Sequence, residues 1–419
     1  MNNKTSKIIF LLICGLLVFA SLARGGVEGW AVAVIHIITL AACTIHLVQK
    51  SLDWDWAWIK TPLDYPVIAL LVITFFATVF SVHRTSSIWA FLLLINYVIV
   101  YYLVIHLTRS PEQMWKTAWV VVSIGVLLAI LGLISFSGLP LFSWWEYQDL
   151  PDFGALTSTY GNPNNIAGFF EMAIPLVLGM LLVEKKESRS LKRYISIMIL
   201  FGMALILSLS RGGWTCATIG LVYFVTILAF SREFPRRKTV IAMVVSAIVL
   251  VLVLLSSFPA VQELLTIQAV MDRAGGLDGR MQVTKAAGVM IADRPLLGFG
   301  PGTFAYSFLK YQPAGIQGWY NMAHNDYVHF TAELGIIFPV IMIWAIIALF
   351  RQGFMKLKSR TLIIRALSLG CMAGIVAILF HSFVDFNLHI PANAMLFTVL
   401  CALVAAPEKN EAQGTGCKA

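Results

Sequence analysis

The sequence predicts an all-α integral membrane protein with about twelve transmembrane helices, and three observations lead to this class. Of the 419 residues, 59% are hydrophobic and only 12% are charged, a balance unlike that of a soluble domain. Apolar runs close to the length that crosses a bilayer recur along the chain. The net charge is +9, and the basic residues fall in short clusters between these runs. This distribution is typical of signals that orient spans in a lipid bilayer and does not indicate a nucleic-acid partner.

The candidate spans are apolar runs, several of them short enough to need flanking residues. In chain order they lie at 8–23, 28–48, 65–82, 88–107, 115–136, 166–183, 194–209, 213–230, 239–258, 336–350, 361–380 and 391–406. Lys4 and Lys7 precede the first run, which resembles a cleavable signal peptide. We expect a retained first helix instead, because so many spans follow it.

Lys and Arg predict the orientation of these spans. With a cytoplasmic N-terminus, the inner loops carry 22 of the 30 basic residues and the outer loops carry the other 8. An even number of spans then places both termini in the cytoplasm. Two outer loops are long, one at 137–165 and one at 259–335. We find no internal repeat and no linker to a soluble domain, so residues 1–419 are expected to form a single polytopic membrane domain.

The first outer loop contains two polar features. Trp144 and Trp145 form a pair at the membrane border, where tryptophan more often anchors the interface than binds a sugar. Asn162, Pro163 and Asn164 are typical of a turn that leads into the next span. This loop therefore offers candidate binding residues, but no catalytic pattern of its own.

Two arginines at the outer face are candidate anion-binding residues. Arg211 lies in Ser-Arg-Gly-Gly-Trp at the outer end of a span, where an arginine can also simply reach the interface. The two glycines favour a functional interpretation, because they let a ligand approach the guanidinium. Arg280 begins an amphipathic stretch in the second outer loop, whose apolar positions suggest a helix at the membrane surface. If both arginines converged, they would suit a phosphate or pyrophosphate.

A histidine in the second outer loop is a candidate general base. His324 opens the segment His-Asn-Asp-Tyr, and an imidazole suits proton transfer near neutral pH. A lone interfacial histidine is more often structural, so both interpretations stay open. His381 and Asp385 are four residues apart and are expected to support the same pocket.

Phosphate-loop and metal chemistry are not predicted. The segment from Gly298 to Gly302 resembles a phosphate-cradling loop, but no strand precedes it and no Lys-Ser/Thr pair closes it. A tight turn is the better interpretation. The single Asp-x-Asp pair, Asp53 and Asp55, is predicted to face the cytoplasm. We therefore expect no metal site and no cofactor.

Five features in this order resemble the superfamily of O-antigen ligases and polymerases, which are bacterial envelope glycosyltransferases. Each motif is weak alone, but the ordered set is more specific and covers most of the chain from about residue 155 to residue 400. The five are Gly161-Asn-Pro-Asn164, Ser210-Arg-Gly-Gly-Trp214, Arg280 with Asp293-Arg-Pro-Leu-Leu-Gly-Phe-Gly-Pro-Gly302, His324-Asn-Asp-Tyr327 with Glu333-Leu-Gly335, and His381 with Asp385-Phe386.

The resemblance implies a membrane-embedded, GT-C-like glycosyltransferase with a periplasmic loop of short amphipathic helices. Such enzymes transfer a glycan from undecaprenyl pyrophosphate to an acceptor hydroxyl at the outer face of the inner membrane, with inversion and without metal. Arg211 and Arg280 would hold the pyrophosphate, and His324 would act as base or position the acceptor. The expected substrate-binding residues are Asn162, Asn164, Asn325, Asp326, Tyr327, His381 and Asp385.

Several functions remain open within and beyond this resemblance. Ligation of the glycan to lipid A–core is the first expectation, and polymerisation of repeat units is the close alternative. The short polar tail disfavours a protein O-oligosaccharyltransferase. A secondary transporter would need pseudo-repeats and ionisable residues near the middle of the membrane, and the sequence suggests neither.

Overall fold

The computed structural model describes residues 3–139, 154–184, 190–231, 233–257, 276–314 and 320–408. Within these ranges the protein is entirely helical, with fifteen α-helices and no strand. Trp144 and Trp145, most of the basic cluster at 185–193, and residues 259–275 of the second outer loop lie outside the described residues.

A helix is present at each of the expected spans. The twelve are α1 (Asn3–Leu22), α2 (Gly29–Leu52), α3 (Asp64–Val79), α4 (Arg84–Leu107), α5 (Pro111–Phe136), α6 (Pro163–Val183), α7 (Ser190–Leu207), α8 (Arg211–Phe230), α9 (Arg237–Ser257), α15 (Ile337–Lys356), α16 (Leu362–His381) and α17 (Pro391–Ala405). Eight of the described helices are long and apolar enough to cross a membrane, and α3 and α17 are shorter apolar helices. The multi-pass membrane class is confirmed, whereas the count of twelve spans stays a prediction.

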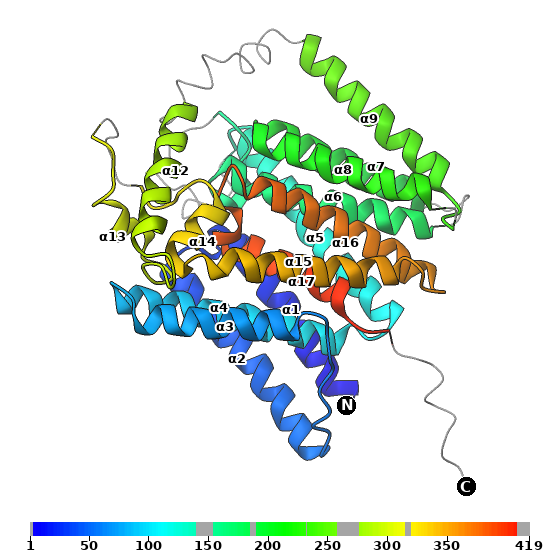
Figure 1. Ribbon diagram of the computed structural model, residues 1–419. Helices are drawn as coiled ribbons and strands as arrows, with labels where there is room; N and C mark the ends of the chain where they lie inside the picture. The colour runs from blue at the N-terminus through cyan, green and yellow to red at the C-terminus, as the bar shows by residue number, and fades with distance from the viewer. Residues whose placement is uncertain are drawn as a thin grey trace.

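Helices α6 and α16 form the centre of the bundle (Figure 1). In the most apolar part of α6, 94% of the residues are buried, against 78% for α16. Glycines set the distance between the two helices: a Cβ added at Gly370 would lie 2.6 Å from the carbonyl oxygen of Pro175, and one at Gly374 would lie 2.6 Å from that of Met172. Small residues let membrane helices approach backbone to backbone, where dispersion contacts are densest.

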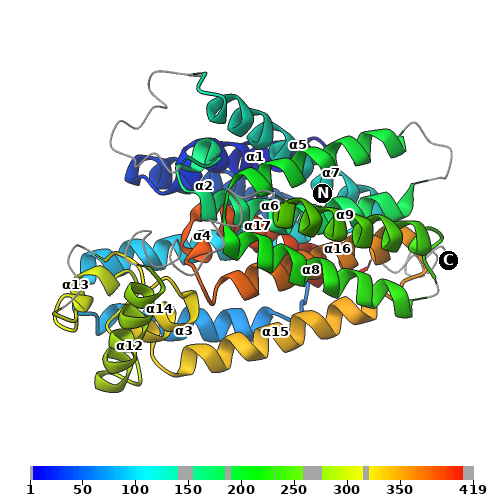
Figure 2. The ribbon, with the colours of Figure 1, turned by 90° about the horizontal axis from the view of Figure 1, so that it is seen from above.

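Three further helices lie together at one end of the bundle, which we call the loop end (Figures 1 and 2). They are α12 (Gly276–Asp293), α13 (Phe304–Phe308) and α14 (Asp326–Leu334). Val283, Ala287 and Met290 on the apolar face of α12 are fully buried and share a small core with Phe304 and Phe308 of α13. The expected amphipathic helix is therefore present, and its apolar face packs on protein.

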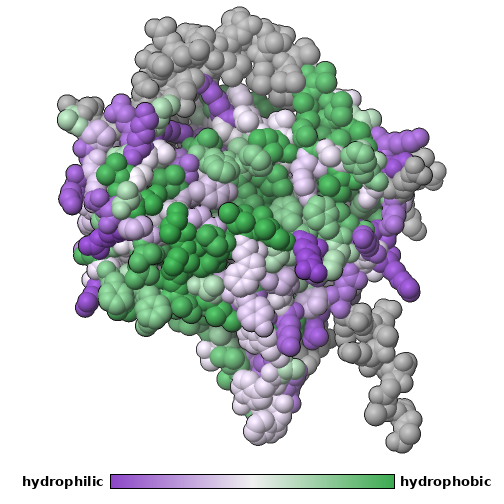
Figure 3. Space-filling view, in the orientation of Figure 1, coloured by the Kyte–Doolittle hydropathy of each residue, from purple (hydrophilic) through white to green (hydrophobic). Residues whose placement is uncertain are grey.

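The surface has the pattern of a membrane protein. Figure 3 shows hydrophobic side chains across the middle of one face, between a hydrophilic margin at the loop end and another at the opposite end. The hydrophobic part includes exposed residues of α3 and α15, such as Val72, Phe75, Ile343 and Ile347. In Figure 1 the N-terminal end of α1 and the C-terminal end of α17 both lie away from the loop end.

Candidate active site

The candidate residues come from helix ends and short segments that meet at the loop end. Arg211 is the first residue of α8, and His381 is the last residue of α16. Asp385 follows α16 in the chain, and His324 precedes α14. Helix ends are suited to such a site, because their backbone is fixed while their side chains project toward water.

Asp385 is the centre of the site and is 1% exposed. Its carboxylate accepts hydrogen bonds from Asn164 Nδ2 and from the backbone NH of Phe386, the latter at 2.8 Å. Asn164 Oδ1 in turn accepts a hydrogen bond of 2.7 Å from Ser210 Oγ, the N-cap of α8. A single chain of polar contacts therefore joins the starts of α6 and α8 to the segment after α16.

His324 lies beside this carboxylate. Its Nδ1 is 3.7 Å from Asp385 Oδ1, beyond normal hydrogen-bond length, and has no hydrogen-bond partner among the described residues. The backbone of His324 is left-handed, with φ +51°, a conformation that is costly for a residue with a side chain. The ring packs edge-on against Phe386, with centroids 5.1 Å apart, and the side chain is 26% exposed. Packing therefore holds a strained histidine next to a buried carboxylate and in contact with solvent.

Arg280 reaches the same segment from α12. Its Nη1 donates a hydrogen bond of 3.1 Å to the backbone carbonyl of Val384. Burial favours the neutral form of Asp385, but the neighbouring His324 imidazole and the charges of Arg280 and His381 outweigh it, so the pKa of Asp385 lies below its usual value. The carboxylate is thus ionised at neutral pH and faces positive groups.

Arg211 begins α8, whose first turn packs against residues 381–385 through Gly212. The next residue, Gly212, packs so closely on His381 that an added Cβ would lie 2.9 Å from the imidazole Nε2. The backbone NH of Asp385 bonds to the carbonyl of His381 at 3.0 Å, which closes the turn. The structure therefore brings Arg280 and the start of α8, which begins with Arg211, to one short turn.

The remaining predicted binding residues bond mainly to the protein itself. Asn162 caps α6, with Oδ1 accepting from the backbone NH of Asn164 at 2.9 Å. Asn325 caps α14 and its Nδ2 donates to the carbonyl of Phe383 at 2.9 Å. Tyr327 donates its hydroxyl to the carbonyl of Leu379 at 2.7 Å. The contacts of Asn325 and Tyr327 tie the start of α14 to the end of α16.

Asp326 has the same kind of role and is 1% exposed. It accepts a hydrogen bond of 2.8 Å from Ser382 Oγ and one of 3.1 Å from the backbone NH of Leu388, and it lies 2.6 Å from His389 Nδ1. Its carboxylate is fully engaged by protein groups.

The sequence interpretation missed Glu171. This residue lies inside α6, is 0% exposed, and its Oε2 is 3.0 Å from His381 Nδ1. The expectation that no ionisable residue lies near the middle of a span is therefore wrong for α6. A lone acid inside an apolar run is the signal that could have found it. Its pairing with His381 fixes the imidazole behind Gly212.

The glycine-rich segment is a turn, as expected. Gly298, Gly300 and Gly302 all have positive φ values. The backbone NH of Gly302 donates to Glu333 Oε2 at 2.9 Å, and the NH of Phe304 donates to Oε1 at the same distance. The NH groups that would cradle a phosphate therefore bind a carboxylate of the protein.

The fold and the site define a class: a multi-pass helical membrane protein with two arginines, a histidine and a buried carboxylate at one end of the bundle. Comparison with known families places part of the chain more narrowly. A family model described as O-antigen ligase matches residues 196–343, so this stretch is similar to the O-antigen ligase family. No curated protein matches the chain.

The match covers Arg211, Arg280 and His324 but ends before His381 and Asp385. Only the contacts in the structure place these two residues in the site. The family covers ligases and polymerases that transfer glycans, which confirms the predicted superfamily without resolving the member.

Proposed function

We propose that the protein transfers a glycan from undecaprenyl pyrophosphate to an acceptor hydroxyl at the periplasmic face of the bacterial inner membrane. The observation that supports this most is the meeting of Arg280, His324 and the start of α8, which Arg211 begins, at the turn 381–385. Two guanidinium groups suit a pyrophosphate because each can donate two parallel hydrogen bonds to its oxygens. The match to the O-antigen ligase family supports the same substrate class.

In the proposed reaction the acceptor oxygen attacks the anomeric carbon of the donor sugar. The bond from that carbon to the pyrophosphate oxygen breaks, and its electron pair leaves with the undecaprenyl pyrophosphate. Arg211 and Arg280 stabilise this departing charge. His324 takes the acceptor proton, and the Asp385 carboxylate stabilises the imidazolium that forms. Attack opposite the leaving group inverts the anomeric centre.

This mechanism uses protein cations where other transferases use a metal ion. We therefore expect transfer by the folded protein to need no added magnesium or manganese. Asn164 and His381 would position Asp385 and the start of α8, as their contacts suggest. Asn162, Asn325, Asp326 and Tyr327 would shape the binding site by fixing the ends of α6, α14 and α16.

Ligation to lipid A–core is the first choice among acceptors, because a compact twelve-span chain whose major outer loop is the one at 259–335 resembles ligases most. Repeat-unit polymerisation is the second candidate and uses the same donor chemistry. Deletion of the gene, read on a lipopolysaccharide gel, separates the two. Loss of all O-chain bands supports a ligase, and a single capped repeat supports a polymerase. An unchanged ladder would contradict both, and substrate-stimulated transport by the purified protein would then favour a transporter.

A further inference from the structure

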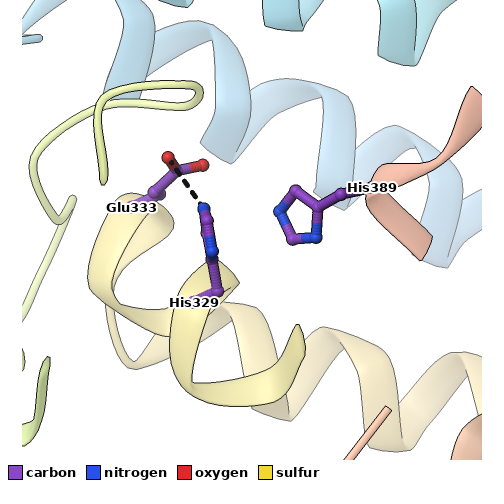
Figure 4. A group of neighbouring side chains, drawn as sticks. All are labelled: His329, Glu333 and His389. Carbon is purple, nitrogen blue, oxygen red and sulfur yellow. Dashed lines mark hydrogen bonds and ion pairs between the residues drawn. The ribbon is translucent and has the colours of Figure 1, made fainter. Parts of the chain in front are cut away.

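A second polar cluster lies beside the candidate active site and shares none of its proposed catalytic groups. His329 and Glu333 occupy one face of α14, four residues apart, and are each 3% exposed. His389 comes from the 3-10 turn η3 (Asn387–His389), and its side chain is 14% exposed. One ligand atom from each residue lies within 4.8 Å of the others. Figure 4 shows the three side chains converging from the two elements.

The contact with Asp326 indicates which ring nitrogen of His389 carries the proton. That carboxyl group accepts the backbone NH of Leu388, lies within bonding distance of Ser382 Oγ, and is 2.6 Å from His389 Nδ1. When Asp326 accepts all three contacts, the hydrogen bond from His389 is donated by Nδ1–H. His389 Nε2 keeps its lone pair, yet it is buried without a hydrogen-bond partner among the described residues. A carboxylate behind an imidazole is the arrangement that orients a metal-binding histidine.

Glu333 is held in position by the turn before α13. Each carboxylate oxygen accepts one backbone NH, from Gly302 and from Phe304. Oε2 keeps a further lone pair for a cation, and the second lone pair of Oε1 faces His329. The third group, His329, has its Nε2 3.3 Å from Glu333 Oε1, so the two side chains are already within reach of one ion.

We propose that His329, Glu333 and His389 bind a divalent transition-metal ion, with Zn²⁺ as the preferred ion. Two imidazole nitrogens and one carboxylate form a ligand set that zinc accepts in tetrahedral geometry, and a water molecule can complete the fourth position. Binding replaces the His329–Glu333 hydrogen bond by two metal bonds and moves the His329 proton to Nδ1. The protonated Nδ1 then no longer accepts the long hydrogen bond of 3.4 Å from the NH of Ala323.

The ion would act as a clamp between α14 and η3. Glu333 and His389 also line an apolar cavity of about 350 Å³ between α3, α4, α15 and α17, and the ion would add to the contacts that Asp326 of α14 makes with Leu388 and His389. His324 lies five residues before His329, and a fixed α14 would keep it beside Asp385. The metal is a positioning element under this proposal and does not enter the transfer reaction. No sequence pattern indicated the cluster, because His389 lies far along the chain from α14.

The test is the metal content of the purified full-length protein, measured by mass spectrometry after dialysis against metal-free buffer and removal of any histidine tag. We expect about one zinc per chain, because the site has three protein ligands. His389→Ala and His329→Ala should lose most of it. His83→Ala, which changes an exposed histidine stacked on Tyr306, should keep it. Wild-type protein that carries no zinc and takes up none, or a His389→Ala variant with unchanged zinc, would overturn the proposal.

Cobalt substitution supplies a readout that does not depend on stable variants. Wild-type protein loaded with Co²⁺ should show the intense visible bands of a tetrahedral site. Only the weak bands of the hydrated ion would contradict the assignment. Neither measurement involves glycan transfer, so a failure here leaves the proposed function standing, and a failure of transfer leaves the metal site standing.

Discussion

The substitution Asp385→Asn removes one charge from the centre of the candidate active site while keeping its shape. The two oxygens of Asp385 accept from Asn164 and from the NH of Phe386, so asparagine, with one acceptor oxygen, keeps one of these two hydrogen bonds. The substitution removes the negative charge 3.7 Å from His324 Nδ1. If His324 takes the acceptor proton, that charge stabilises the imidazolium in the transition state.

The size of the effect follows from this distance. With an effective dielectric constant of about 20, a unit charge pair at this separation is worth roughly 4 kcal/mol. That energy corresponds to about a thousandfold in rate. Solvent at the partly exposed His324 screens some of it, so we expect kcat to fall by about 10²–10³. Donor binding should change less, because the arginines remain.

The assay is single-turnover transfer from a lipid-linked glycan in proteoliposomes, normalised to the amount of inserted protein. Asp293→Asn is the matched control, because it makes the same change at an exposed residue that bonds to Tyr311. Wild-type kcat in Asp385→Asn would refute the role of the carboxylate. A decrease in inserted protein with unchanged kcat would show that Asp385 is purely structural.

Comparison of the wild type with Asp385→Asn also tests the lowered pKa of Asp385. Because the folded pKa is lowered, the carboxylate contributes stability that is complete above the ordinary aspartate pKa. That contribution disappears as the pH falls below this value and through the folded pKa. Thermal unfolding followed by tryptophan fluorescence should therefore show a larger decrease in stability on acidification in the wild type than in Asp385→Asn. Parallel acid profiles would contradict the lowered pKa.

Two further predictions concern packing and topology, and each compares a pair of substitutions. Gly212→Ala places a methyl group 2.9 Å from His381 Nε2, and we expect transfer activity per inserted protein to fall sharply. Gly288→Ala in α12 meets nothing within 4 Å and should keep full activity, so equal activities would refute the packing argument. In a cysteine-free background, a cysteine at Lys310 should label with an impermeant thiol reagent in spheroplasts, whereas one at Arg360 should not. Labelling at Arg360 alone would reverse the proposed topology.

The helices could be predicted from the sequence because hydropathy and length determine them directly. Their ends were less predictable, because contacts from distant residues decide them. The run expected at 65–82 ends as a helix at Val79, and the NH of Val82 bonds instead to the carbonyl of Phe299 at 3.1 Å. Nothing local to this run indicates that partner.

The charged residues of the site could also be found, because an apolar chain retains few of them. Arg211, Arg280, His324 and Asp385 were all recognised in this way. The contacts between the site residues could not be predicted from the sequence. Asp385 and Asn164, for example, are far apart in the chain and meet only through the packing of α6 on α16. The family match does not supply them either, since it ends at residue 343.

The role of each residue was the least predictable property. Asn325, Asp326 and Tyr327 follow His324 directly and suggested a binding motif, yet their side chains bond to the segments at the end of and after α16. A sequence motif indicates which residues act together, but only the contacts distinguish a residue that meets substrate from one that holds its neighbour.

The central claim is that Arg280 stabilises the departing pyrophosphate, and Arg280→Ala tests it most directly. Transfer activity is measured per inserted protein, and binding of the lipid-linked donor is measured separately. Removal of one donor to the developing charge predicts a fall of about 10²–10³ in rate. Arg280→Lys should recover little, because lysine keeps the charge but lacks the planar fork. Near-wild-type transfer by Arg280→Ala would contradict the account.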